Sequence, residues 1–127
     1  MEYRWWSHWS DRFGPYAERL VLHADLRAEF SGLSFTDRKG EFAGRITAED
    51  WQAVIAMLNE SGFISMASSY WPEHNIHDAG HRRVTVTRGG AERSVEEYAG
   101  SGPDELWALT KALAALSDRV AWHTAGE

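Results

Sequence analysis

Cysteine is absent from the 127 residues of this chain, which excludes disulfide bridges and any chemistry that needs a thiolate. The chain also lacks an apolar run of about 18 residues, the length that a membrane-spanning helix requires, so no membrane span is expected. Its first residues, from Met1 to Trp6, lack the basic start and the apolar stretch of a secretion signal. These absences predict a cytoplasmic protein.

Positive charge is in deficit. The chain carries 13 basic and 19 acidic residues, which gives a net charge of −6 with neutral histidines. Nucleic-acid binding requires a clustered positive face, so a nucleic-acid partner is not expected. An acidic surface would suit a basic partner, but it is explained more simply as a solvated surface.

The sequence lacks internal repeats and low-complexity segments, and its length leaves room for one hydrophobic core. We therefore expect a single domain over 1–127, with its core within 2–120 and a frayed tail at 121–127. What the chain has in excess is tryptophan. Its seven indole side chains can fill a small core or line a binding surface.

The clearest structural signal is an alternation of apolar or small residues with mostly polar ones between residues 20 and 30. The apolar or small positions are Leu20, Leu22, Ala24, Leu26, Ala28 and Phe30. A period of two is typical of a strand with one buried and one solvated face. It predicts one long strand at 18–31.

Four further strands are expected, at 2–9, 41–46, 83–88 and 93–98. The first carries aromatic residues on both faces and is expected at an edge of the sheet. A Gly-Gly pair between the last two predicts a hairpin turn.

Two helices are expected. Thr47 caps the first helix, which ends at Gly62, and Pro103 is expected at the first position of the second. Their core positions follow the helical period and are Trp51, Val54, Ile55 and Leu58 in the first helix and Leu106, Leu109, Leu113 and Leu116 in the second. The predicted fold is α+β, an antiparallel sheet of about five strands in the order β-β-β-α-β-β-α with two helices packed on one face.

A set of short motifs carries a resemblance to a known family. In chain order they are Gly14-Pro15-Tyr16, Gly62-Phe63, Tyr70, Asp78-Ala79, Tyr98-x-Gly100 and Pro103-x-x-Leu106. Over residues 10–117 the chain resembles a divergent member of a bacterial family of small domains of unknown function, often found in lipoproteins. Usual members open with a Cys-Phe/Tyr-Gly-x-Cys-Pro-x-Tyr motif, whereas this chain has Gly14 before Pro15 and no cysteine. The resemblance supports the fold and implies no catalytic residues.

Three histidines form the sharpest candidate for chemistry. On a helix the spacing of His74, His77 and His81 would place three imidazoles on one face, where they could hold a zinc-like divalent ion. Glu73 or Asp78 could then serve as a base for a metal-bound water. The alternative is a polar loop that binds nothing in particular.

A second candidate is a set of aromatic residues at the N-terminal side, joined by one tryptophan further along. Its members are Trp5, Trp6, Trp9, Phe13, Tyr16 and Trp71. They could form a site for a hydrophobic small molecule, with His8 or His23 as a polar contact. They could equally anchor a protein interface, or fill the core.

A third candidate is His23 with Asp25. These two residues are expected side by side on the outward face of the long strand, where a histidine and a carboxylate could act as a general base. A solvated sheet face explains them more simply, because no motif places a nucleophile nearby.

The sequence therefore predicts a non-enzymatic binding module without a cofactor. Its partner is expected to be an unknown protein or a small hydrophobic ligand, and its recognition surface the aromatic N-terminal strand with the loop 70–81. The alternative is a small metal-dependent or small-molecule enzyme, which would use the cluster of His74, His77 and His81 or an aromatic pocket.

Overall fold

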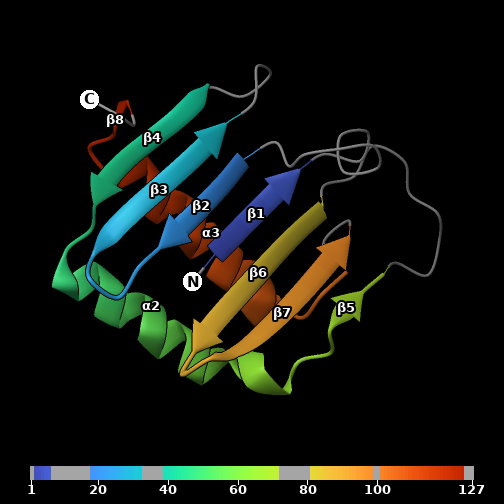
Figure 1. Ribbon diagram of the computed structural model, residues 1–127. Coiled ribbons are helices and arrows are strands. Elements are labelled where there is room, and N and C mark those ends of the chain that lie inside the picture. Colours follow the sequence, from blue (N-terminus) through green and yellow to red (C-terminus); the bar gives the residue numbers. More distant parts are fainter. Residues whose placement is uncertain (1, 7–17, 33–38, 72–80, 99–100, 125–127) are drawn as a thin grey trace.

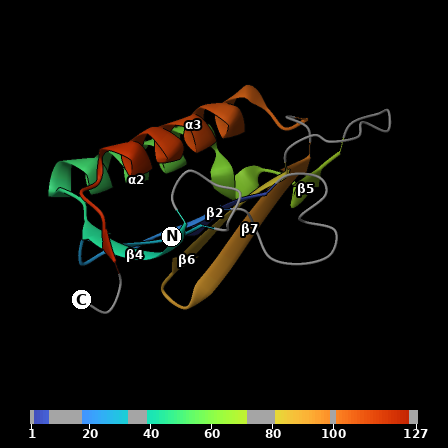
Figure 2. The same cartoon turned by 90° about the horizontal axis from the view of Figure 1, so that it is seen from above.

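The computed structural model describes residues 2–6, 18–32, 39–71, 81–98 and 101–124 of the chain (Figure 1). Within these parts the chain forms one eight-stranded sheet in the order β5-β7-β6-β1-β2-β3-β4-β8. Both long helices lie on the same face of this sheet, as the view in Figure 2 shows. The predicted α+β class, with two helices packed against a largely antiparallel sheet, is confirmed.

The strands are β1 (Glu2–Trp6), β2 (Glu18–Leu22), β3 (Arg27–Gly32), β4 (Gly40–Arg45), β5 (Ser69–Tyr70), β6 (His81–Arg88), β7 (Ala91–Tyr98) and β8 (His123–Thr124). The helices are α2 (Ala48–Ser61), the short 3-10 helix η1 (Phe63–Ser65) and α3 (Asp104–Arg119). Every pair of neighbouring strands is antiparallel except β5 and β7, which are parallel. The sheet therefore has more strands than the sequence predicts.

The predicted single strand at 18–31 is wrong, because the chain turns back within it. The backbone N–H of His23 donates to the carbonyl of Arg27 at 2.9 Å, and that of Leu26 donates to the carbonyl of His23 at 2.9 Å. Leu26 adopts a left-handed conformation, with φ of 75°, that closes the turn. The alternation of the sequence nevertheless continues across the turn. Leu22 and Ala28 are paired across the two strands, so their side chains share a face, and both are buried in the core. They are six residues apart, and an even spacing keeps the apolar positions in step.

The first strand lies at the centre of the sheet, between β2 and β6, and not at the expected edge. The described strand ends at Trp6, so the rest of the predicted range, residues 7–9, lies outside the described residues. A strand with two hydrogen-bonded neighbours cannot offer its backbone to a partner, because both edges are already paired.

The predicted ends of the first helix are confirmed. The Thr47 hydroxyl accepts from the backbone N–H of Asp50 at 3.0 Å, and the Asp50 carboxylate accepts from the backbone N–H of Thr47 at 3.3 Å. Gly62 closes α2 in a left-handed conformation with φ of 71°. The sequence predicts Pro103 at the first helical position, but it is the N-cap of α3, one residue before the helix begins at Asp104.

The core lies between the two helices and the sheet. All four leucines of the predicted α3 stripe are buried, as are Val54 and Leu58 of α2. Trp51 and Ile55 are partly buried against this core. No helix in the described parts of the chain is long and apolar enough to cross a membrane.

Residues 121–124, which were expected to fray, join the fold. His123 pairs with Ala43 in the ladder between β8 and β4. The indole N–H of Trp122 donates to the carbonyl of Ser117 at 2.8 Å, and its ring lies 5.6 Å from that of Phe30.

Candidate functional site

The sheet register aligns parts of the predicted recognition surface at one end of the sheet. Trp6 of β1 is opposite His81 of β6, and His81 is opposite Tyr98 of β7. Trp71 follows β5, the next strand in the sheet, and its ring stacks on that of Tyr98 with 5.5 Å between centroids and 27° between planes. The N-terminal strand and both ends of the loop 70–81 therefore lie at the same end of the sheet, on the neighbouring strands β5, β7, β6 and β1.

Several predicted site residues lie outside the described residues. They are His8, Trp9, Phe13, Tyr16, His74 and His77. Trp5 and Trp6 lie on β1, and His81 begins β6. Among the described residues no group of three or more histidine, cysteine or carboxylate side chains is placed to hold a metal ion. The predicted cluster of His74, His77 and His81 stays a prediction.

Trp71 is a surface residue, with 62% of it exposed. Tyr98 beneath it is half-buried, and strand periodicity places Tyr98 on the sheet face that the helices do not cover, because Glu97 faces them. The backbone N–H of Glu96 donates to the carbonyl of Ser68 at 2.9 Å, which holds the segment before Trp71 against β7. On the same face Arg83 Nε lies 2.8 Å from Glu96 Oε1, so these two charges offset each other.

A second aromatic side chain is exposed on the helix side. Trp107 of α3 is 42% exposed, and the guanidinium of Arg82 lies 4.9 Å from its ring centre. The ammonium of Lys111 lies 5.0 Å from the same ring. Sequence reasoning missed this residue, although its place between Leu106 and Leu109, outside the leucine stripe, signals an exposed position.

The predicted pair of His23 and Asp25 is wrong. His23 Nε2 instead lies 2.7 Å from Glu29 Oε2, across the hairpin. Asp25 accepts from the side chain and the backbone N–H of Arg27 at 2.7 and 3.1 Å, and these hydrogen bonds lower the pKa of Asp25 below its ordinary value. His23 also lies beyond the end of β2 that is remote from Trp6, so the structure separates it from the aromatic row.

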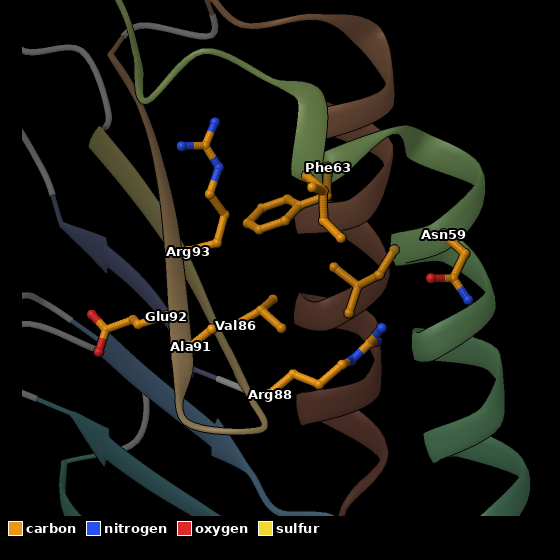
Figure 3. Close-up of a pocket in the computed structure, with 9 residues that line it drawn as sticks. Asn59, Phe63, Val86, Arg88, Ala91, Glu92 and Arg93 are labelled. Atoms are coloured by element: carbon orange, nitrogen blue, oxygen red, sulfur yellow. The ribbon is translucent and has the colours of Figure 1, made fainter.

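An apolar pocket of about 260 Å³ lies between the C-terminal end of α2, η1 and the hairpin of β6 and β7 (Figure 3). Leu58, Phe63, Ile64, Val86 and Ala91 supply most of its apolar lining. Sequence reasoning missed this pocket as well, because its walls come from two segments, 58–64 and 86–93, that are far apart in the chain. The one local signal is a pair of apolar residues directly after the helix-ending Gly62.

A family model described as a domain of unknown function, DUF6438, matches residues 18–117. The match runs from the first residue of β2 into the last turn of α3 and so covers the hairpins, the pocket and the β5–β7 end of the sheet. No curated protein and no solved structure matches the chain.

Proposed function

The chain belongs to the DUF6438 family, and we propose that it acts as a binding module for a protein partner. Its recognition surface would be the aromatic surface at one end of the sheet, defined by Trp71 and Tyr98, with His81 opposite Tyr98 and Trp6 opposite His81. The observation that carries this proposal is the exposed ring of Trp71 resting on Tyr98.

Physical reasoning supports an interface at this position. Tryptophan and tyrosine dominate the binding energy of protein interfaces because they bury a large area at a small cost in side-chain entropy. The stack on Tyr98 already restricts the Trp71 ring, so less freedom is lost when a partner covers it. The neighbouring Arg83 and Glu96 are paired with each other, which makes ring burial the main attraction.

A protein fits this surface better than a small molecule does. The aromatic row lies across neighbouring strands of a sheet, and a broad partner surface can cover such a row. Loss of one aromatic anchor typically costs about 2 kcal/mol or more, which corresponds to about 30-fold in Kd. We therefore expect Trp71→Ala to weaken partner binding by about that factor.

The experiment is site-specific photo-crosslinking. A photoreactive phenylalanine replaces Trp71 in one protein and Trp107, the exposed tryptophan on the helix side, in the matched control. We expect a discrete protein adduct from position 71 alone, competed by excess unmodified protein and not by the Trp71→Ala protein. Equal labelling from both positions, or competition by the Trp71→Ala protein, would contradict the proposal.

This proposal requires no cofactor. We also propose that the chain is a divergent member of a bacterial family with a paired-cysteine motif. The residues that correspond to this motif, 14–16, precede the matched segment. The alternative of a zinc-like ion at His74, His77 and His81 has its own test. Elemental analysis of untagged protein, with His77→Ala as the comparison, detects or excludes bound metal.

A further inference from the structure

The apolar pocket arises from the way α2 ends. Gly62 turns the chain with φ of 71°, after which Phe63 enters the core and Ile64 turns outward with 74% of it exposed. The tip of the hairpin of β6 and β7 lies opposite, with Val86 and Ala91 facing the helix end (Figure 3). The result is a concave apolar surface bounded by three fixed elements, which is the usual form of a small-ligand site.

The size of the pocket limits what it can hold. Its volume of about 260 Å³ lies just below the range of about 300–1,000 Å³ that is typical of drug-sized ligands. A space of this size admits a short acyl chain or a single ring. A folded peptide segment would not fit inside.

The charged side chains that face the pocket have one sign. Strand periodicity places Arg88 and Arg93 on the helix side together with Val86 and Ala91. Glu92 belongs to the opposite face, and Figure 3 shows its carboxylate pointing away from the pocket. Two guanidinium groups and an amide, that of Asn59, are therefore the polar groups nearest the apolar lining.

The two arginines differ in their contacts. The Arg93 guanidinium donates to the carbonyl of Met66 and to the hydroxyl of Ser68, so it holds the segment after η1 in place. Arg88 is exposed, and within the described parts of the chain it has no hydrogen bond or ion pair from its side chain. A guanidinium without a protein partner beside an apolar cavity is a suitable donor to a carboxylate, which it can bind through two parallel hydrogen bonds.

We infer that this pocket binds a small amphiphile with a carboxylate head, such as a medium-chain carboxylic acid. The acyl chain lies along Leu58, Phe63 and Val86, and the carboxylate accepts hydrogen bonds from Arg88 at the mouth. Arg93 adds positive potential and keeps the wall of the pocket fixed. This site is separate from the aromatic surface at Trp71 and does not depend on the function proposed there.

The test is a titration of isotopically labelled protein followed by amide chemical shifts, with octanoate, octanol and octylamine as probes. We expect octanoate to shift the amides of Phe63, Ile64 and Ala91 and to bind about tenfold or more tightly than octanol, because a charge-assisted hydrogen bond is gained. Octylamine should bind more weakly than octanol, because its ammonium meets two cations.

Variants then separate the tail from the head. Arg88→Gln should abolish the preference for octanoate over octanol and leave octanol binding unchanged. Arg45→Gln, an exposed arginine on β4, is the matched control and should keep the preference. Ile64→Glu places a negative charge at the mouth without disturbing the core and should weaken octanoate more than octanol.

Three results would overturn the inference. No shift with any probe would mean that the pocket takes no amphiphile. Equal binding of octanoate and octanol, or an octanoate preference that survives Arg88→Gln, would mean that no carboxylate is recognised at Arg88. Trp71→Ala should leave the octanoate titration unchanged, so this outcome does not depend on the result of the crosslinking experiment.

Discussion

Arg82 and Glu97 lie directly opposite each other across the ladder of β6 and β7, with 3.3 Å between Arg82 Nη1 and Glu97 Oε1. Glu97 is only 1% exposed. Its other carboxylate oxygen accepts from the backbone N–H of Gly102 at 3.1 Å, just before α3 begins. One buried carboxylate therefore joins two strands to the start of a helix.

Removal of this carboxylate should be strongly destabilising. We expect Glu97→Ala to lower the free energy of unfolding by about 3–5 kcal/mol, because it leaves the Arg82 guanidinium and the Gly102 N–H without their acceptor. Urea unfolding measures the change. Glu96→Ala is the matched control on the other face of β7, where loss of the more exposed pair with Arg83 should cost about 1 kcal/mol or less. A Glu97→Ala loss no larger than that of Glu96→Ala would contradict the prediction.

Gly44 should not tolerate even a methyl group. A Cβ at this position would lie 2.6 Å from Val120 Cγ1 and 3.2 Å from both the carbonyl oxygen of Ala121 and Trp122 Cε3. Gly44→Ala should therefore cost about 1–3 kcal/mol of unfolding free energy by overpacking. In the Val120→Ala background the nearest obstructing atom is gone, so the same substitution should cost less, as a double-mutant cycle would show. Additive losses would contradict this packing.

Two tryptophans should behave in opposite ways when truncated. Trp122 packs on Phe30 and bonds to Ser117, so Trp122→Ala should cost about 3 kcal/mol of stability. Trp71 lies on the surface, so Trp71→Ala should change stability by no more than about 0.5 kcal/mol. Thermal and urea unfolding of both variants tests this. Comparable losses would mean that Trp71 has a structural role, which would weaken the case for an interface.

Local chemistry made some elements predictable from the sequence. The Gly89-Gly90 turn could be predicted because both glycines adopt positive φ, 59° and 83°, which other residues rarely do. The α2 start could be predicted because the side chains of Thr47 and Asp50, three residues apart, each bond to the backbone N–H of the other. The turn at His23 to Leu26 could not, because it lacks glycine, asparagine and proline and its left-handed position is filled by a leucine.

The candidate site was less predictable than the fold, because it depends on which strands become neighbours. The many aromatic residues of the sequence predict an exposed aromatic surface near Trp71. That Trp6 lies at the same end of the sheet could not be predicted, because it depends on the central position of β1 next to β6. Spacing along a strand predicts that His23 pairs with Asp25. The hairpin brings Glu29 to His23 instead, because the turn at 23–26 reverses the chain.

The last prediction concerns pH and the capping box of α2. Burial alone would raise the pKa of Asp50, but hydrogen bonds from the backbone and hydroxyl of Thr47, with the nearby Arg119, outweigh it and hold the pKa below its ordinary value of 3.8. The folded carboxyl thus has a lower pKa than the unfolded one. Its contribution to stability is therefore fully present above pH 3.8 and is lost as the pH falls through the folded value.

We therefore expect Asp50→Ala to cost about 1 kcal/mol at pH 7, the usual worth of a helix cap. Below pH 3.8 the difference between this variant and the parent protein should shrink toward zero, because the parent carboxyl is then becoming protonated. Urea unfolding of both proteins across this range measures the difference. Glu49→Ala, an exposed carboxylate in the same turn, should cost much less at pH 7. A loss for Asp50→Ala that stays constant down to pH 2.5 would show that the charge of Asp50 does not stabilise the helix start.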